Sequence, residues 1–178
     1  MVTFSLEEYS ISIYTGEPPV ILDHYLKHAL FVDDKGLAND GTAVHIIIAT
    51  RFPHEQYVII AFRSFPVDCA GFHPNLLYEN TSQTLFIGAG TVVKVFNIAD
   101  KRIVFEKDAG VGFLGWNKYK NYIVQQEELT VGIFDLQGKQ LWQTDVEPPY
   151  NLDFDGDILS LKFNDKVERR LLENGILT

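Results

Sequence analysis

The stretch VKVFNIADKRI at residues 93–103 returns, 38 residues further on, as VGIFDLQGKQL at residues 131–141. Each copy has the pattern of an apolar strand, a polar turn that ends in Lys, and the start of a second strand. Each copy also follows one more short apolar run and, further back, a Gly-Phe pair, Gly71-Phe72 and Gly112-Phe113. The sequence therefore predicts two consecutive antiparallel β-meanders within residues 71–147.

A repeat interval near 40 residues with several strands per unit is typical of propeller blades. The phrases FHPN at 72–75 and VFNI at 95–98 resemble blades of WD-repeat proteins, and IFDLQGKQLW at 133–142 resembles these or quinoprotein-type propeller blades. Two units cannot close a ring, because propellers need about four blades or more. The resemblance thus implies an open pair of twisted sheets or a partial propeller-like stack.

The remaining chain also favours short strands, because Gly and Pro punctuate runs rich in Val, Ile, Phe and Tyr. Helical spacing over Val20–Phe31 predicts one helix, Val167–Leu172 fits either a turn or a strand, and Asp155-Gly156 favours a type I′ hairpin turn. We expect a mainly β fold in one domain, 1–178, with a C-terminal hairpin and tail over 148–178. The predicted strands are Tyr9–Tyr14, Ala43–Arg51, Tyr57–Phe62, Thr84–Gly88, Val92–Ile98, Arg102–Glu106, Tyr122–Gln126, Thr130–Leu136, Gln140–Thr144, Asn151–Phe154 and Ile158–Phe163.

The composition limits the classes of partner. The 178 residues carry a net charge of −9, which repels phosphate backbones and makes nucleic-acid binding unfavourable. Such a surface attracts a basic partner, although acidity also serves solubility alone. Acids near the N-terminus, short apolar runs and a single cysteine predict a cytoplasmic protein without a signal peptide, membrane span or disulfide framework.

The sequence holds no recognisable catalytic motif. A Gly-x-Ser-x-Gly elbow and a phosphate-binding loop are absent. Cys69 and His73 lack a catalytic signature. His24 and His28 have the i, i+4 spacing of zinc ligands and Asp23 could join them, but no Glu adjoins His24, so the zinc-protease motif is absent. The carboxylates from Asp153 to Asp157 fail the spacing of a calcium loop. We therefore expect no catalytic residue, no metal and no cofactor.

Charge is distributed unevenly along the chain. Residues 121–178 contain eleven acids and five bases, whereas residues 61–120 contain five acids and seven bases. Carboxylates that surround aromatic anchors suit a basic protein surface, because the rings supply desolvated contact and the acids supply steering. The predicted partner-binding residues are Glu127, Glu128, Trp142, Asp145, Glu147, Tyr150, Asp153, Asp155 and Asp157.

These features are similar in type to bacterial toxin-immunity proteins, including those of contact-dependent inhibition. The resemblance implies a cytoplasmic antitoxin that occludes the active site or substrate surface of a basic, nuclease-type toxin. An alternative is an enzyme or small-ligand binder whose site is assembled by the fold from His45, His54, His73, Arg63 and Cys69, with Arg51 nearby. A third possibility is an accessory piece of a larger assembly that uses exposed strand edges.

Overall fold

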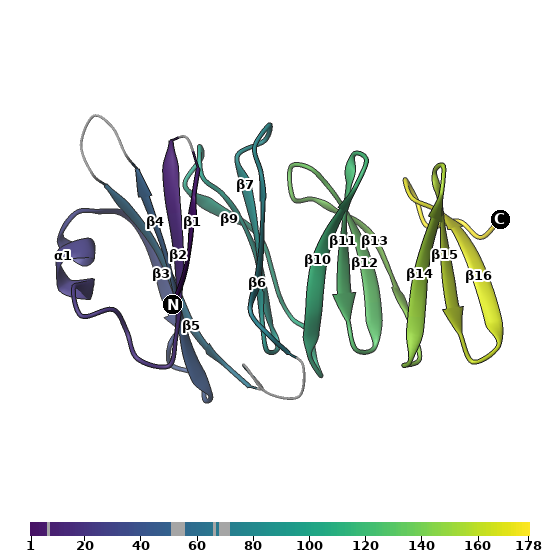
Figure 1. Cartoon of the computed structure of the whole chain (residues 1–178), viewed down its shortest axis with the longest axis horizontal. Helices are drawn as coiled ribbons and strands as arrows, with labels where there is room; N and C mark the ends of the chain where they lie inside the picture. Colours follow the sequence, from purple (N-terminus) through teal and green to yellow (C-terminus); the bar gives the residue numbers. More distant parts are fainter. Residues whose placement is uncertain (7, 51–55, 66, 68–71) are drawn as a thin grey trace. The chain divides into compact units, whose positions relative to one another are not determined.

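The structure, a computed structural model, describes residues 1–6, 8–50, 56–65, 67 and 72–178 (Figure 1). Its chain divides into two compact units, residues 1–67 and residues 68–178. The described residues form sixteen strands and one helix. The predicted mainly β fold with consecutive antiparallel meanders is confirmed. No helix among these residues is long and apolar enough to cross a membrane.

The first unit is a five-stranded sheet in the order β1-β2-β4-β5-β3. Neighbouring strands are antiparallel except β3 and β5, which are parallel. Residues 43–48 and 57–62 are buried, as expected where a continuous apolar run forms a central strand. The bounds are β1 (Val2–Ser5), β2 (Tyr9–Thr15), β3 (Ala29–Gly36), β4 (Thr42–Thr50) and β5 (Tyr57–Ser64).

The helix predicted over Val20–Phe31 is wrong in length. Helix α1 (Leu22–Lys27) has six residues, and strand β3 begins at Ala29. The edge of β5 offers the chain from Ala29 onward a parallel pairing, with two register shifts, and this pairing overrides a weak helical pattern. Helix α1 packs on one face of the sheet, where the Tyr25 and Tyr57 rings lie 4.5 Å apart.

The second unit consists of three antiparallel meanders in chain order. Two of them have four strands. The third has three, which are the hairpin expected within 148–178 and one further strand. The first sheet contains β6 (Asn75–Glu79), β7 (Thr84–Ala89), β8 (Val92–Asn97) and β9 (Arg102–Asp108). The second contains β10 (Phe113–Tyr119), β11 (Tyr122–Glu127), β12 (Thr130–Asp135) and β13 (Gln140–Asp145), and the third contains β14 (Tyr150–Asp155), β15 (Ile158–Phe163) and β16 (Lys166–Leu171).

The 38-residue repeat corresponds to equivalent strands of the first two sheets. One copy forms β8 and the start of β9, and the other forms β12 and the start of β13. Both copies share a register shift, between Val95 and Phe96 in β8 and between Ile133 and Phe134 in β12. The sheets are therefore propeller-like blades, as the repeat predicted.

Two apolar layers join the three sheets of this unit. Between the first and second sheets, Phe86, Trp116 and Phe134 are buried, with ring centroids 5.2–6.3 Å apart. Gly88 has no room for a side chain, because an added Cβ would overlap the Phe113 ring. Between the second and third sheets, Val124, Ile133, Leu159 and Leu161 form the corresponding layer. Each meander thus buries an apolar face on the next.

All eleven predicted strands are present, although their ends differ by a few residues and Arg51 lies outside the described residues. Val167–Leu172, which left two alternatives open, mostly forms β16. The hairpin predicted at Asp155-Gly156 is also present, but its two loop residues are Gly156 and Asp157, and only Gly156 has positive φ, at 61°. The type I′ assignment is therefore wrong, because that turn needs positive φ at both loop residues.

Candidate protein-docking surface

The meander topology brings together connections that are distant in the sequence. In an antiparallel meander every second connection lies at the same end of the sheet. In the second unit one end collects residues 90–91, 109–112, 128–129, 146–149 and 164–165, with the strand residues next to them. We name this region the acidic end, and Figure 1 shows these connections at the lower edge of the three sheets.

Hydrogen bonds connect successive turns and linkers along the acidic end. The N–H of Phe113 donates to the Gly90 carbonyl at 2.8 Å, and the N–H of Glu128 donates to the Gly112 carbonyl at 2.9 Å. The Val146 N–H then donates to the Leu129 carbonyl at 2.9 Å. The side-chain amide of Asn164, in the last connection, donates to the carboxylate of Glu147. This bracing holds the end as one continuous ridge.

Carboxylates dominate the ridge. Asp108, Asp145, Glu147 and Asp165 are exposed and Glu128 is half-buried, while Lys166 is an exposed base at the same end. Lys107 lies there too, but its ammonium group is 2.8 Å from a carboxylate oxygen of buried Glu127. Because Lys107 is neutralised by Glu127, the exposed carboxylates outnumber the remaining base, Lys166, and the acidic end is negatively charged.

Two apolar side chains accompany these carboxylates. Val111 is 42% exposed and Leu129 is 45% exposed, and they stand in adjacent connections. Exposed apolar groups with charges around them are the usual composition of a protein-binding surface. The acidic end therefore combines steering charge with groups that gain from desolvation.

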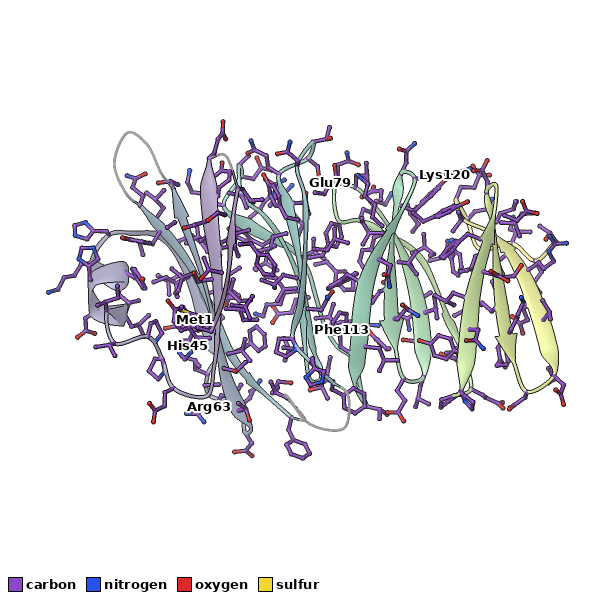
Figure 2. The ribbon with its side chains drawn as sticks, viewed as in Figure 1. Met1, His45, Arg63, Glu79, Phe113 and Lys120 are labelled. Atoms are coloured by element: carbon purple, nitrogen blue, oxygen red, sulfur yellow. The ribbon has the colours of Figure 1, made fainter. Side chains whose placement is uncertain are left out.

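At the opposite end of the same unit, two lysines are paired with carboxylates. Lys118 binds the carboxylate of Glu79, and the Lys120 ammonium lies 3.0 Å from Asp157 (Figure 2). Burial alone would raise the pKa of Glu79, but hydrogen bonds from Lys118 and Thr81, together with the Lys118 charge, lower it. The hydrogen bond from Lys120 to Asp157 raises the pKa of that lysine despite some desolvation.

The structure separates the nine predicted partner-binding residues into three groups. Glu128, Asp145 and Glu147 lie together on the acidic end. Asp153, Asp155 and Asp157 are exposed, as predicted, but they lie elsewhere: the first two on the outer face of β14 and the third in the β14–β15 turn. Each of these three has a cationic neighbour, Lys162 at 2.5 Å, Arg169 at 3.8 Å and Lys120 at 3.0 Å, respectively.

The third group consists of Glu127, Trp142 and Tyr150, whose side chains form hydrogen bonds or ion pairs inside the second unit. Glu127 is 2% exposed, contrary to the expectation of a surface carboxylate, because strand β11 directs it toward Lys107 and Thr130. The Trp142 indole N–H donates to the Leu172 carbonyl at 2.7 Å. The Tyr150 hydroxyl donates to the Glu127 carbonyl at 2.6 Å, and burial together with the Glu127 charge raises the pKa of Tyr150 to about 12.

The residues of the alternative, fold-assembled site are only partly described. His54, Cys69 and Arg51 lie outside the described residues. His45 and Arg63 stand on neighbouring strands β4 and β5 (Figure 2), whereas His73 belongs to the second unit. Burial, followed by the Arg63 charge, lowers the pKa of His45, which favours a neutral imidazole.

The histidine rings of His24, in α1, and His28, which follows its last residue, lie close together. The His24 and His28 rings lie 4.8 Å apart, and His24 also lies 5.9 Å from the Tyr57 ring. Within the described part of the chain, no group of three or more His, Cys, Asp or Glu residues could hold a metal ion.

Comparison with known proteins gives structural similarity alone. No protein-family model and no curated protein sequence matches this chain. Among solved structures, BamB from Moraxella catarrhalis aligns over 84% of this chain and 50% of its own, at 14% identity and a TM-score of 0.42. Hsv2 from Kluyveromyces marxianus aligns over 56% and 33%, at 11% identity and a TM-score of 0.33. This chain thus spans a third to a half of the length of these proteins.

Proposed function

We propose that this chain is a non-catalytic protein-binding module, which binds a basic protein through the acidic end of its second unit. The observation that supports this function is the convergence of Asp108, Glu128, Asp145, Glu147 and Asp165 on one braced ridge. Rim carboxylates of this kind accelerate encounter with a positively charged partner and orient it. Val111 and Leu129 would then supply the apolar contact that holds the complex together.

A basic, nuclease-type toxin domain is the partner class that we propose for this surface. Such a domain carries cations where it receives nucleic-acid phosphates, so a row of carboxylates can occupy the same positions. Braced backbone at the acidic end would let the module bind with little loss of conformational entropy. Under this proposal the module acts as an immunity protein, by occlusion of the toxin's substrate surface.

Affinity capture from the source cells with three baits tests the proposal. The baits are the wild-type chain, an acidic-end variant (Glu128→Ser, Asp145→Ser, Glu147→Ser) and a charge-matched control (Asp153→Ser, Asp155→Ser, Asp157→Ser). Quantitative mass spectrometry should find a basic protein that the wild type and the control retain and the acidic-end variant loses. A partner that all three baits retain equally, or a partner without net positive charge, would contradict the proposal.

A further inference from the structure

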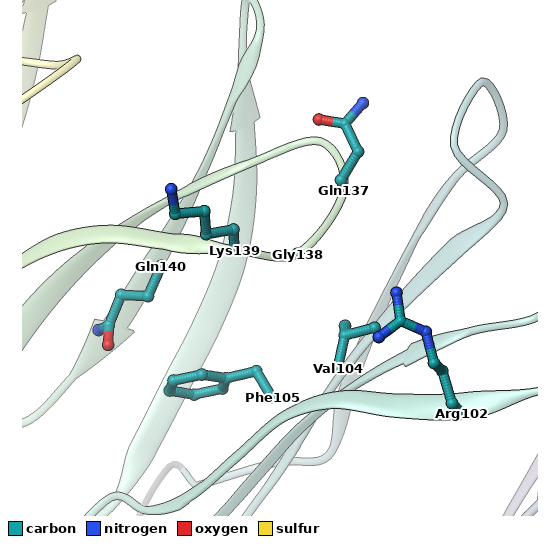
Figure 3. A pocket seen from close by; sticks show the side chains of 7 residues that line it. All are labelled: Arg102, Val104, Phe105, Gln137, Gly138, Lys139 and Gln140. Carbon is teal, nitrogen blue, oxygen red and sulfur yellow. The ribbon is translucent and has the colours of Figure 1, made fainter. Parts of the chain in front are cut away.

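A cavity of about 440 Å³ lies at the other end of the second unit. Its walls come from the beginning of β9 and from the turn between β12 and β13, in two different sheets. This volume is within the usual range of small-ligand sites, roughly 300–1,000 Å³. Figure 3 shows the lining side chains, which are those of Arg102, Val104, Phe105, Gln137, Lys139 and Gln140, together with Gly138.

The charge of this cavity is opposite to that of the whole protein. Arg102 and Lys139 both line it, and no carboxylate does. The Asp100 carboxylate lies 3.2 Å from Nε of Arg102, which orients the guanidinium and leaves its terminal nitrogens available. Within the described part of the chain no carboxylate pairs with Lys139. Two cations beside one cavity suit an anion, because each can donate a charge-assisted hydrogen bond.

The turn that carries Lys139 is held in place before any ligand arrives. The backbone N–H of Lys139 donates to the Asp135 carboxylate at 2.8 Å, and the Ser82 hydroxyl donates to the Leu136 carbonyl at 2.5 Å. Gly138 has φ of 89° and is buried against β8 and β9, where an added Cβ would lie 2.5 Å from Val95 and 2.9 Å from Val104. A fixed turn keeps its donors in position and lowers the entropic cost of binding.

The rest of the lining is apolar or carries amides. Val104 and Phe105 are half-buried, and the Phe105 ring meets the Phe134 ring edge-to-face at 5.0 Å, which fixes its orientation. Gln137 and Gln140 add neutral donors and acceptors at the turn. An apolar surface next to two cations favours a ligand that has both an anionic group and an apolar body.

We propose that this cavity binds a small organic anion, in which a carboxylate or phosphate group is attached to an apolar ring. The oxygens of the anion would meet Arg102 and Lys139, and the ring would lie against Val104 and Phe105. This site is separate from the acidic end, so it can exist whether or not that surface binds a protein.

NMR titration of the full chain with benzoate, phenyl phosphate and phenol tests the site. We expect saturable shifts of the amides of residues 104–105 and 137–140 with one or both anions, and none with neutral phenol. Preference for benzoate or for phenyl phosphate identifies the anionic group. Equal binding of phenol, or shifts that do not saturate with either anion, would overturn the proposal.

Matched variants separate the site from general charge effects. Arg102→Gln and Lys139→Gln should each weaken anion binding at least about fivefold, as loss of a charge-assisted hydrogen bond at a partly exposed site predicts. Lys101→Gln makes the same charge change outside the lining and should leave affinity within about twofold. Equal weakening by Lys101→Gln would overturn the proposal, whereas unchanged anion binding in the acidic-end variant would show that the two proposals stand separately.

Discussion

Glu127 and Glu128 are neighbours in the chain, yet they belong to two regions of different character. Glu127 is the last residue of β11 and is buried with Lys107, Gln125 and Thr130 as its polar partners. Glu128 begins the next connection and belongs to the acidic end. The buried Glu127 carboxylate is thus fixed by polar partners, whereas Glu128 contributes to the more exposed acidic end.

Buried charges in the second unit are paired throughout its described core. Glu79 is bound by Lys118, Lys94 lies 2.7 Å from Glu106, and Glu127 meets Lys107. Removal of one partner from such a pair leaves an uncompensated charge in a region of low dielectric constant. The carboxylates of the acidic end are not buried, although Glu147 accepts a hydrogen bond from Asn164. We therefore expect their removal to affect partner binding more than stability.

Glu127→Ala should therefore have the largest effect on stability. We expect the free energy of unfolding to fall by roughly 3–5 kcal/mol, because Lys107, Gln125 and the Thr130 hydroxyl lose a shared acceptor. Urea denaturation followed by circular dichroism measures the change. Glu128→Ala is the control and should stay within about 0.5 kcal/mol of wild type; similar losses in both variants would remove the distinction between the two regions.

Tyr150→Phe should have a smaller effect, a loss of about 1 kcal/mol, since one buried hydrogen bond to the Glu127 carbonyl disappears. The raised pKa of about 12 adds a pH signature. Above pH 10 the unfolded phenol ionises before the folded one, so wild-type stability should fall as pH rises toward 12. Urea denaturation at pH 9 to 11 should show that the free energy of unfolding falls less steeply with pH in Tyr150→Phe than in the wild type. Parallel pH curves for the two proteins would contradict the buried hydrogen bond of Tyr150.

Glu79 provides the corresponding test in acid. Its pKa is lowered in the folded state from an ordinary value of 4.5. The pair with Lys118 thus adds stability above pH 4.5, and this contribution is lost as pH falls below that value. Glu79→Gln should flatten the acid dependence of the unfolding free energy, whereas Glu128→Gln should not. Equal slopes for the wild type and Glu79→Gln would exclude the assigned pairing.

The smallest effect is expected on the outer face of the third sheet. Asp153→Ser and Asp155→Ser remove exposed carboxylates that pair with Lys162 on the neighbouring strand β15 and with Arg169 on β16. Exposed pairs of this kind contribute little, at most about 1 kcal/mol. The midpoint of thermal unfolding should shift by only a few degrees. A large shift would show that these aspartates stabilise the fold as Glu127 does.

The sequence predicted the strands whose apolar pattern was regular. The repeat at 93–103 and 131–141 identified two blades because their strands alternate and their turns match. Strand β10 was missed because a register shift between Phe113 and Gly115 interrupts the alternation. Local spacing predicts a helix over residues that include the start of strand β3, because pairing with the edge of β5 is a long-range effect that local spacing does not contain.

The candidate surface could be predicted only in part. The acidic character of the C-terminal third was visible as a count of charges, and Glu128, Asp145 and Glu147 were among the predicted residues. The sequence did not indicate Asp108 and Asp165. They reach the acidic end only because every second connection of a meander lies at the same end of the sheet. The cations that pair with Asp153, Asp155 and Asp157 come from other strands or another sheet, so their neutralising effect was not visible in the local sequence.

A salt titration of partner affinity tests whether the acidic end is the surface that binds a basic protein. Isothermal calorimetry would compare the captured basic partner with the wild-type chain, the acidic-end variant and the charge-matched control at low and high ionic strength. We predict that the acidic-end variant loses at least about tenfold in affinity at low salt and shows a flatter salt dependence, while the control stays within about threefold. Equal losses in both variants would contradict the account, since net charge and not the acidic end would then explain binding.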